Sequence, residues 1–403
     1  MRILFLGYWG LHDGLTVSTI FPHLRILQER PDVAAVRLVT IERGAEAQAE
    51  LTFAPGFETG KISFEPLRSR PGRNVILNKI EDFTRFPNEL VKQVAEFRPD
   101  FILARGTPAG SLAYLVWQKT KLPFYVESYE PHADYMLDSG VWGRYDPRYL
   151  FQRHWEIKQK ELALGLMPVA ENYRQQLIRE GVPAGRVVTV PCSVNADAFA
   201  FDAGARARVR QRLGWPAEAV VGVYVGKFGG IYYDEEAFEV FKMAAEYFGP
   251  AFRLLLLTPL PAGVVQNRLA SVGLSPAQTF VAKVPFVEVP QFLSAADFAF
   301  GLHRPTLFVS PIKHGEYWAN GLPIFLSDGV GDDSEIIKKE GGGAVFEWAN
   351  PYSIRIGLQD IKTLLLTPHY RAKSQMLAQK YRSTRPVEAA YSLIMTDNSK
   401  DRD

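Results

Sequence analysis

The residue types and spacing best suited to chemistry occur in residues 310–323, which follow an apolar run at residues 298–302. Ser310 is a good helix N-cap, and Pro311 is favoured at the first helical position. Lys313 then falls in the first turn, where a cation opposes the helix dipole. A bound phosphate reverses that effect, because it meets free backbone N–H groups and the lysine ammonium together. We interpret this segment as a candidate anion site.

Glu316 is the second reactive group of the segment. It follows Lys313 by three residues, so the two side chains share one side of the expected helix. The alternative is a plain surface ion pair. The functional interpretation is favoured by the position of the segment after a strand, because ligands bind at the carboxyl ends of parallel strands. His303 and Arg304, in the connection before the helix, add two polar side chains at the same place.

A glycine-containing loop follows another apolar run, at residues 220–225. Gly226, Gly229 and Gly230 would let backbone amides come close to a ligand, and Lys227 could neutralise diphosphate charge. The spacing matches neither the dinucleotide-binding fingerprint nor the Walker motif, so it excludes both of those nucleotide sites. An ordinary strand-to-helix turn is the alternative. We expect this loop and residues 310–323 to lie at the carboxyl ends of strands in one sheet.

Three segments nearer the N-terminus also combine polar residues with strand ends. Gly14, in residues 11–16, could bring backbone near a substrate or belong to a plain turn. Arg105 could be a salt-bridge residue or a polar group in a cleft. Residues 127–134 concentrate three acids, a tyrosine and His132. This histidine is either a structural hydrogen-bonding group or a residue for sugar recognition and acid–base work.

Apolar strand-like runs recur at helix-sized intervals and form two series. The first lies at residues 3–7, 36–41, 101–104, 124–127, 166–170 and 187–190, and the second at residues 220–225, 254–257, 279–284, 298–302, 323–326 and 344–346. Amphipathic stretches separate them, so the pattern predicts an α/β protein with two doubly wound parallel sheets. The break between the series follows Pro191. Residues 386–395 are expected to be helical, and residues 396–403 to be a disordered tail.

Charge and composition exclude several classes of protein. The 403 residues include 46 Lys and Arg against 44 Asp and Glu, a net charge of +2, which makes nucleic acid an unexpected partner. One cysteine, Cys192, allows no internal disulfide and no tetrathiolate metal site, and it fits a reducing compartment. The sequence indicates neither a signal peptide nor an apolar run of about 18–20 residues. We therefore expect a soluble, cytoplasmic protein.

Four segments in order resemble the GT-B glycosyltransferases, most closely the retaining enzymes of glycosyltransferase family 4. Gly-Lys-Phe at residues 226–228 is similar to the family's Gly-Arg-Leu, and residues 288–297 to its E-V-x-x-Y-L-x-x-A-D helix. Residues 316–323 match its E-x-x-A-x-G-x-P signature. Residues 191–195, with Phe199 after them, resemble its P-N-G-V-D-x-x-x-F linker.

The resemblance implies the GT-B fold, with two Rossmann-like domains facing a cleft. Residues 1–195 would bind the acceptor and residues 196–385 the nucleotide sugar, while residues 386–396 would return as a helix to the first domain. It implies an enzyme that moves a sugar, with retention at the anomeric carbon, from a nucleotide-diphosphate donor to a glycan or lipid-linked acceptor. Synthesis of surface polysaccharide is the expected setting.

The family's site residues can be placed on this chain. The glutamate that binds the ribose hydroxyls corresponds to Glu316, and the Arg and Lys pair at the phosphates corresponds to Lys227 and Tyr232. Because Tyr232 carries no charge, Lys313 is expected to supply the missing cation. Phe308 stands where the family has a second glutamate, so His303, Arg304 and Ser310 are the expected substitutes in donor binding. His132 lies where the family often has a histidine near the donor sugar.

No cofactor and no catalytic metal are expected, since the chain's one Asp-x-Asp triplet lies at residues 401–403 in the tail. The basic residues 68–79 could contact anionic lipid at the inner face of a membrane or form a solvated loop. Two other functions stay open. One is a GT-B nucleotide-sugar epimerase, for which residues 127–134 offer carboxylates. The other is a non-catalytic two-lobe sugar-binding protein, which would need an export signal.

Overall fold

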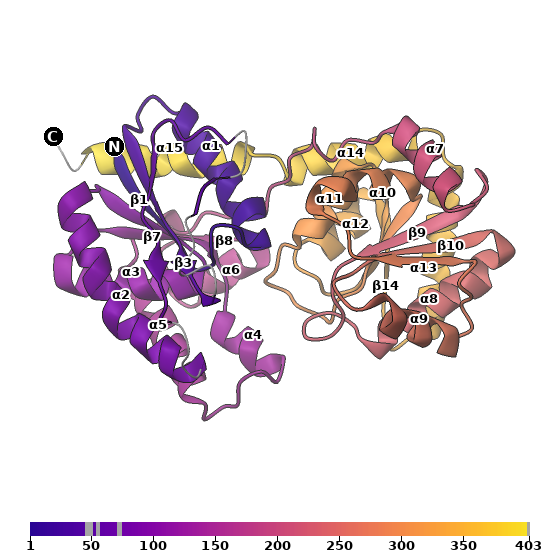
Figure 1. The fold of residues 1–403 in the computed structure, drawn as a ribbon, viewed down its shortest axis with the longest axis horizontal. Helices are drawn as coiled ribbons and strands as arrows, with labels where there is room; N and C mark the ends of the chain where they lie inside the picture. Colours follow the sequence, from indigo (N-terminus) through magenta and orange to yellow (C-terminus); the bar gives the residue numbers. More distant parts are fainter. Residues whose placement is uncertain (45–50, 54–56, 71–74, 401–403) are drawn as a thin grey trace. The chain divides into compact units, whose positions relative to one another are not determined.

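The computed structural model describes residues 1–403 apart from residues 45–50, 54–56, 71–74 and 401–403 (Figure 1). The chain divides into two compact units. Unit 1 comprises Met1–Pro191 and Arg385–Asp403, and unit 2 comprises Cys192–Thr384. Each unit is built on one six-stranded sheet in which every neighbouring pair of strands is parallel.

The large sheet of unit 1 has the strand order β4-β2-β1-β6-β7-β8. Its strands are β1 (Arg2–Gly7), β2 (Ala35–Val39), β4 (Ile62–Phe64), β6 (Phe101–Arg105), β7 (Phe124–Tyr129) and β8 (Gly165–Pro168). Strands β3 (Ile41–Glu42) and β5 (Leu67–Arg68) pair separately. The chain moves outward from β1 in one direction and then returns to its other side at β6. This reversal creates a topological switch point between β1 and β6.

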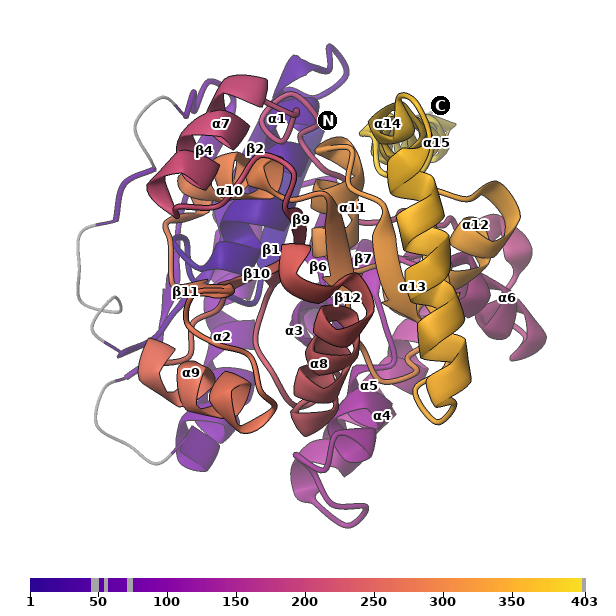
Figure 2. The same cartoon turned by 90° about the vertical axis from the view of Figure 1, so that its right-hand side faces the viewer.

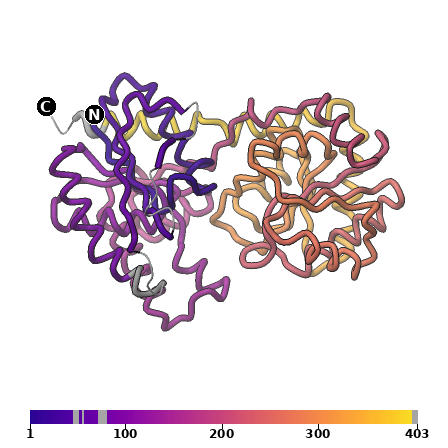
Figure 3. The backbone as a smooth tube through the Cα atoms, viewed as in Figure 1, coloured from indigo at the N-terminus to yellow at the C-terminus, as the bar shows by residue number. Residues whose placement is uncertain are grey.

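Helices cover both faces of this sheet. The π-helical turn Thr16–Ile20, α1 (Phe21–Glu29) and α15 (Arg385–Lys400) share one hydrophobic core with the strands. Val387 and Tyr391 of α15 are buried in that core, and Figure 3 shows the last helix in yellow beside the indigo segments of unit 1. The other helices of unit 1 are α2 (Val75–Phe97), α3 (Thr107–Thr120), α4 (His132–Asp138), α5 (Pro147–Leu162) and α6 (Glu171–Arg179).

Unit 2 repeats the arrangement with the strand order β11-β10-β9-β12-β13-β14. Its strands are β9 (Val220–Val225), β10 (Phe252–Leu257), β11 (Thr279–Ala282), β12 (Phe298–Gly301), β13 (Ile324–Ser327) and β14 (Gly343–Phe346). Along β10, Leu254 and Leu256 enter one core, whereas Leu255 and Leu257 enter the other. A strand buried on both faces must be apolar throughout, which is why these strands stand out as continuous apolar runs.

The two cores of unit 2 lie under different sets of helices, as Figure 2 allows the reader to follow. Helices α8 (Glu235–Phe248), α9 (Ala262–Ser271) and α13 (Pro351–Leu366) share one core. The opposite core includes residues of α7 (Ala203–Arg212), α10 (Val289–Ala295), α11 (Ile312–Ala319), α12 (Asp333–Glu340) and α14 (Tyr370–Tyr381). The expected fold class, two doubly wound parallel sheets, is therefore confirmed.

Three details of the prediction are wrong. Residues 187–190 form no strand, since they make a single β-bridge, between Leu166 and Val187. A longer ladder would need a backbone hydrogen bond donated by residue 168, which is a proline and has no N–H. Strand β4 was not predicted, since three residues are too few for a recognisable pattern. The expected disordered tail is helical as far as Lys400, and residues 401–403 lie outside the described residues.

The expected basic contact surface at residues 68–79 is only partly described, because residues 71–74 lie outside the described residues. Among the described helices, none is both long enough and apolar enough to cross a membrane.

Candidate functional site

Two loops at one edge of the unit 2 sheet carry most of the candidate residues. Residues 226–234 follow β9, and residues 302–311 follow β12, the strand that pairs directly with β9. Backbone bonds join the loops, since the Tyr233 N–H donates to the Leu302 carbonyl at 3.2 Å and the Arg304 N–H to the Ile231 carbonyl at 2.8 Å. As predicted, both segments lie at carboxyl ends of one sheet. The strand order places them at its topological switch point, the preferred ligand position of such sheets.

The loop after β9 needs its glycines for backbone conformation. Gly229 and Gly230 have φ values of +84° and +68°, which other residues rarely adopt. The N–H groups of Gly226 and Gly229 already donate to Leu257 and Tyr233, so they are not free to bind a ligand. Gly230 is exposed, and a Cβ there would meet nothing within 4 Å. Of the three glycines proposed to meet a ligand, Gly230 is the one whose amide is left without a backbone acceptor in the described structure.

Lys227 is exposed and forms no ion pair with any residue that the structure describes. Its backbone carbonyl accepts a 2.5 Å bond from the Tyr224 hydroxyl, which ties the loop to β9. Tyr232, at the position where the family has a second cation, packs its ring 4.6 Å from the ring of His303. Lys227 is thus a cation without a protein partner in this loop, a suitable group for an anionic ligand.

Lys313 and Glu316 form an ion pair with 2.9 Å between Nζ and Oε2, but it is not an ordinary surface pair. The Lys313 side chain is 34% exposed, whereas that of Glu316 is 1% exposed. Burial raises the pKa of Glu316, and the neighbouring Lys313 ammonium offsets part of that rise. The next residue, Tyr317, accepts a 2.9 Å bond from the Val225 N–H, which fixes α11 against the end of β9.

Ser310 does not cap α11, contrary to the sequence prediction. The helix begins at Ile312 with Pro311 in the N-cap position and no side-chain cap. The Ser310 hydroxyl instead accepts bonds from the Cys192 N–H, at 3.1 Å, and from the Arg382 guanidinium. Ser310 is buried, and its hydroxyl oxygen accepts both bonds from residues of unit 2. Its role in the described structure is therefore structural.

His303 and Arg304 also have protein partners or surroundings that limit their roles. His303 is 4% exposed, and burial together with nearby His314 holds its pKa well below the ordinary value, so its ring is neutral. It can therefore donate or accept a hydrogen bond but supplies no charge. Arg304 is half exposed, and its guanidinium lies 2.7 Å from the carboxylate of Glu236.

The sequence interpretation missed a buried polar network behind this site. His314 Nδ1 lies 2.7 Å from Asp333 Oδ2, and the other oxygen of Asp333 accepts a bond from Arg382. The side chains of all three are at most 3% exposed. Although burial opposes ionisation, Arg382 and His314 keep the pKa of Asp333 below its ordinary value. The spacing of these residues in the sequence does not predict the network, because its members come from three separate helices or helix ends.

His132 and Gly14 belong to unit 1. His132 is the first residue of α4, with Nδ1 3.7 Å from the Glu130 carboxylate and its ring 5.6 Å from that of Trp142 in an edge-on arrangement. At Gly14, a Cβ would meet nothing within 4 Å and no positive φ occurs, so the fold of unit 1 does not itself require glycine there.

Arg105 is a salt-bridge residue, which decides between the two interpretations of its role. Its Nη1 lies 3.3 Å from Glu127 Oε2, and both side chains are at most 5% exposed. His23 Nδ1 lies 3.3 Å from the same carboxylate, which also accepts a bond from the Tyr391 hydroxyl of α15. Burial alone would raise the pKa of Glu127, but these charged and hydrogen-bonding partners hold it at about 2.

Glu156, near His132, is a buried acid whose pKa is raised, whereas the pKa of Glu127 is lowered. Its carboxylate accepts bonds from the Ala133 N–H, at 3.0 Å, and from Gln152 Nε2, at 2.9 Å. Burial raises its pKa to about 7, although these two bonds oppose the rise. The folded protein therefore holds this proton between pH 4.5 and 7, where the unfolded chain has lost it.

This shift predicts the behaviour of a Glu156→Gln variant. Because Glu156 must ionise at a cost in the fold, the stability of the parent protein falls as pH rises through this window. Relative to the parent, the variant should gain about 3 kcal/mol of unfolding free energy between pH 4.5 and 8. Urea denaturation at several pH values measures the difference. Parallel pH profiles for the two proteins would contradict a raised Glu156 pKa.

In the ranges that the structure describes, no three His, Cys, Asp or Glu residues lie close enough together to hold a metal ion. The Asp-x-Asp triplet at residues 401–403 lies outside these ranges.

Comparison with known proteins places the first part of the chain in a family. Residues 24–193 match the family described as "Glycosyl transferase 4-like domain". No curated protein sequence is similar enough to count as a relative.

Solved structures share the fold over almost the whole chain. HepE from Anabaena, solved in complex with UDP, is 13% identical, with 98% of this chain and 100% of HepE aligned at a TM-score of 0.73. Sucrose-phosphate synthase from Thermosynechococcus elongatus is 15% identical, with 98% and 99% aligned at 0.74. WaaG, a glycosyltransferase involved in lipopolysaccharide biosynthesis, is 14% identical, with 97% and 99% aligned at 0.70. With a glycosyl transferase 4-like domain at residues 24–193 and the two parallel sheets of the GT-B fold, the chain is a glycosyltransferase.

Proposed function

We propose that this glycosyltransferase moves a sugar from a nucleoside-diphosphate donor to a glycan or lipid-linked acceptor, with the donor diphosphate bound at the carboxyl edge of the unit 2 sheet. The observation that carries the proposal is the buried Glu316 carboxylate and its pair with the 34% exposed Lys313, on the helix that contacts the end of β9. The loop after β9 bears the exposed Lys227, which pairs with no acid among the described residues. Structures of HepE with UDP and with UDP-glucose support a uridine nucleotide as the first donor to test.

The two lysines would act on the leaving group. As the bond to the sugar breaks, negative charge builds on the departing diphosphate, so fixed cations there stabilise the transition state more than the ground state. Lys227 and the Lys313 ammonium at the start of α11 are the cations to which we assign this role. We propose that they supply the charge that a divalent metal provides in other transferases, so that catalysis needs no metal.

Glu316 would bind the ribose. An ionised carboxylate offers about four lone-pair sites, of which Lys313 uses one, so the others can accept bonds from a vicinal diol. Gly230, with an amide free of backbone acceptors, would lie toward the phosphates. We further propose that the sugar is transferred with retention at the anomeric carbon and that His132 acts near the donor sugar. The proposed setting is surface-polysaccharide synthesis at the inner face of a membrane.

Single substitutions of the two lysines test the proposed anion site. In Lys227→Ala and Lys313→Ala, the affinity for UDP should fall by about 10- to 100-fold, because a hydrogen bond to a charged group contributes about 1.5–3 kcal/mol. Isothermal titration calorimetry measures the dissociation constants. The matched control is Lys338→Ala, since Lys338 forms an i, i+3 ion pair with Glu335 on the exposed face of α12. Unchanged affinity in both active-site variants would contradict the proposal.

Product analysis distinguishes the possible reactions. NMR of the parent enzyme with UDP-glucose and acceptor should show a retained α-linkage, with the same rate in EDTA. An inverted product would contradict retention, and loss of turnover in EDTA would contradict metal independence. A new nucleotide sugar formed without any acceptor would identify an epimerase instead.

A further inference from the structure

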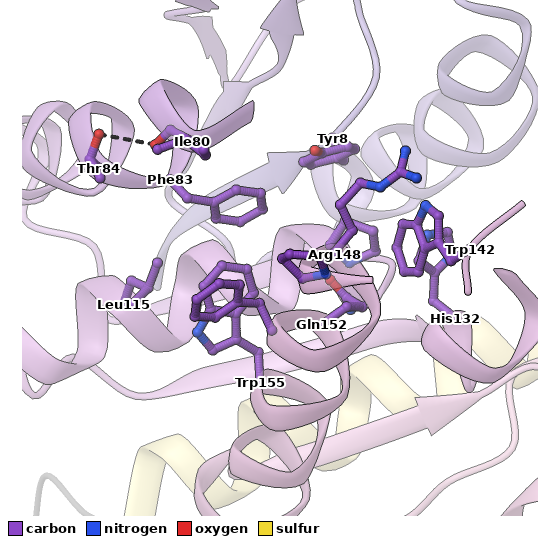
Figure 4. Close-up of a pocket in the computed structure, with 13 residues that line it drawn as sticks. Tyr8, Ile80, Phe83, Thr84, Leu115, His132, Trp142, Arg148, Gln152 and Trp155 are labelled. Atoms are coloured by element: carbon purple, nitrogen blue, oxygen red, sulfur yellow. Dashed lines mark hydrogen bonds between the residues drawn. The ribbon is translucent and has the colours of Figure 1, made fainter. Parts of the chain in front are cut away.

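Unit 1 contains a cavity of about 320 Å³ (Figure 4). His132 is the one residue of its wall to which the proposed function gives a role in donor binding. Aromatic side chains dominate its wall, among them Tyr8, Phe83, Trp142, Phe151 and Trp155. They come from the residue after β1, from α2, from the connection after α4 and from α5. The rings of Phe83 and Trp155 lie 4.6 Å apart, and Phe151 packs 5.9 Å from Trp155.

The cavity lies on the ligand-binding edge of the unit 1 sheet. Tyr8 directly follows β1, Pro108 is the second residue of the helix after β6, and His132 begins the helix after β7. These three wall residues therefore mark the carboxyl ends of three neighbouring parallel strands. In open α/β sheets, this is the edge where ligands bind, which distinguishes the cavity from a packing defect elsewhere in the core.

Three polar side chains in the wall already have protein partners. The Arg148 guanidinium is paired with Asp146, with Nε 3.0 Å from Oδ1. Gln152 Nε2 donates to Glu156, and the Thr84 hydroxyl donates to the Ile80 carbonyl of its own helix at 3.0 Å. A sugar ring placed here would bury several hydroxyl groups with few partners, which is costly. A hydrocarbon group would not, and it would cover Phe151 and Ile80, which are 60% and 58% exposed.

We infer that this cavity binds an uncharged hydrocarbon group of the acceptor, next to the hydroxyl that receives the sugar. The inference rests on the proposed function, because it assigns the class of acceptor to that reaction. An aromatic aglycone and the first units of a lipid chain offer the same apolar chemistry. His132 lies at the wall, with Nδ1 3.7 Å from the Glu130 carboxylate.

Binding of simple glycosides tests this assignment without donor chemistry. Phenyl, hexyl and methyl β-D-glucopyranosides are titrated against the intact protein while the fluorescence of its tryptophans, including Trp142 and Trp155, is followed. Phenyl or hexyl glucoside should bind at least tenfold more tightly than methyl glucoside. Preference for phenyl indicates an aromatic acceptor, and preference for hexyl a lipid-linked one. Equal affinity for all three would overturn the inference.

A substitution that fills the cavity provides the second arm. Thr84→Phe should weaken binding of the preferred glucoside at least tenfold, and Ala95→Phe, at an exposed position of the same helix outside the cavity wall, should leave it unchanged. Phe151→Ala, at a 60% exposed position, removes part of the wall and should also weaken binding. Unchanged affinity in both cavity variants would overturn the inference. UDP affinity should stay the same in all of them, and failure of the parent protein to bind UDP would contradict the proposed donor site alone.

Discussion

Replacing Glu316 with glutamine is expected to lower kcat/KM for the nucleotide-sugar donor by about 10²- to 10³-fold. Glutamine keeps the shape of the side chain but removes the charge, which weakens two hydrogen bonds to the ribose diol by about 1.5–2 kcal/mol each. Because the side chain is 1% exposed, no water can replace the lost interactions easily. Steady-state kinetics with varied donor and saturating acceptor measures the effect.

The matched control for this variant is Glu335→Gln on α12. Glu335 accepts from Lys338 at 2.9 Å, as Glu316 accepts from Lys313, but its side chain is 69% exposed. The Glu335→Gln substitution should change kcat/KM for the donor less than twofold. If the folded Glu316→Gln variant lost less than threefold in kcat/KM, Glu316 would not be a donor contact, and the ion pair would be structural.

The second large effect is expected on stability. Glu127→Ala should lower the free energy of unfolding by about 3–5 kcal/mol, because it removes the carboxylate that pairs with the buried Arg105 guanidinium and leaves that charge without an acidic partner. It also removes the acceptor of the Tyr391 hydroxyl, which holds α15 to the sheet of unit 1. Urea denaturation measures the loss. The control, Glu161→Ala, breaks the exposed pair with Lys158 and should cost less than about 1 kcal/mol.

The pH dependence of this effect has a definite sign. The pKa of Glu127 is about 2 in the fold against an ordinary value of 4.5, so its ionised form stabilises the fold. The stabilisation is fully present above pH 4.5 and is lost as pH falls toward 2, a change of about 3 kcal/mol. The difference in unfolding free energy between the parent and Glu127→Ala should therefore become smaller as pH falls from 4.5 toward 2. A difference that stayed constant with pH would show that the variant acts through lost packing.

Features that depend on local periodicity could be predicted from the sequence. All six strands of the unit 2 sheet were predicted. The four central strands are buried on both faces, which makes each one an unbroken apolar run. The edge strands β11 and β14 are only partly buried but are mainly apolar as well. The proximity of Lys313 and Glu316 follows from the helical repeat alone. Strand β4 was missed, since it has three residues and lies at the edge of its sheet.

Features that depend on tertiary packing could not be predicted. The sequence offered Ser310 as an N-cap, but Arg382 reaches it from the far end of α14 and takes its oxygen. The cavity of unit 1 is also invisible in the sequence, because Phe83 and Trp155 on two separate helices have the spacing of ordinary core residues. The role of the Glu127 carboxylate depends on Tyr391, which lies 264 residues later.

The return of α15 makes unit 1 discontinuous in the chain, and this has a consequence for biosynthesis. Val387, Tyr391 and Ile394 complete the core that begins at Ile3, yet the 193 residues of Cys192–Thr384 must be translated between them. At about 5–20 residues per second, the ribosome needs roughly 10–40 s for that interval. During it, the nascent first unit exposes the apolar groove that α15 will fill, while the second unit can already fold as an uninterrupted segment. The unit that is synthesised first is thus the last to mature, and chaperones that bind apolar grooves have that interval in which to act.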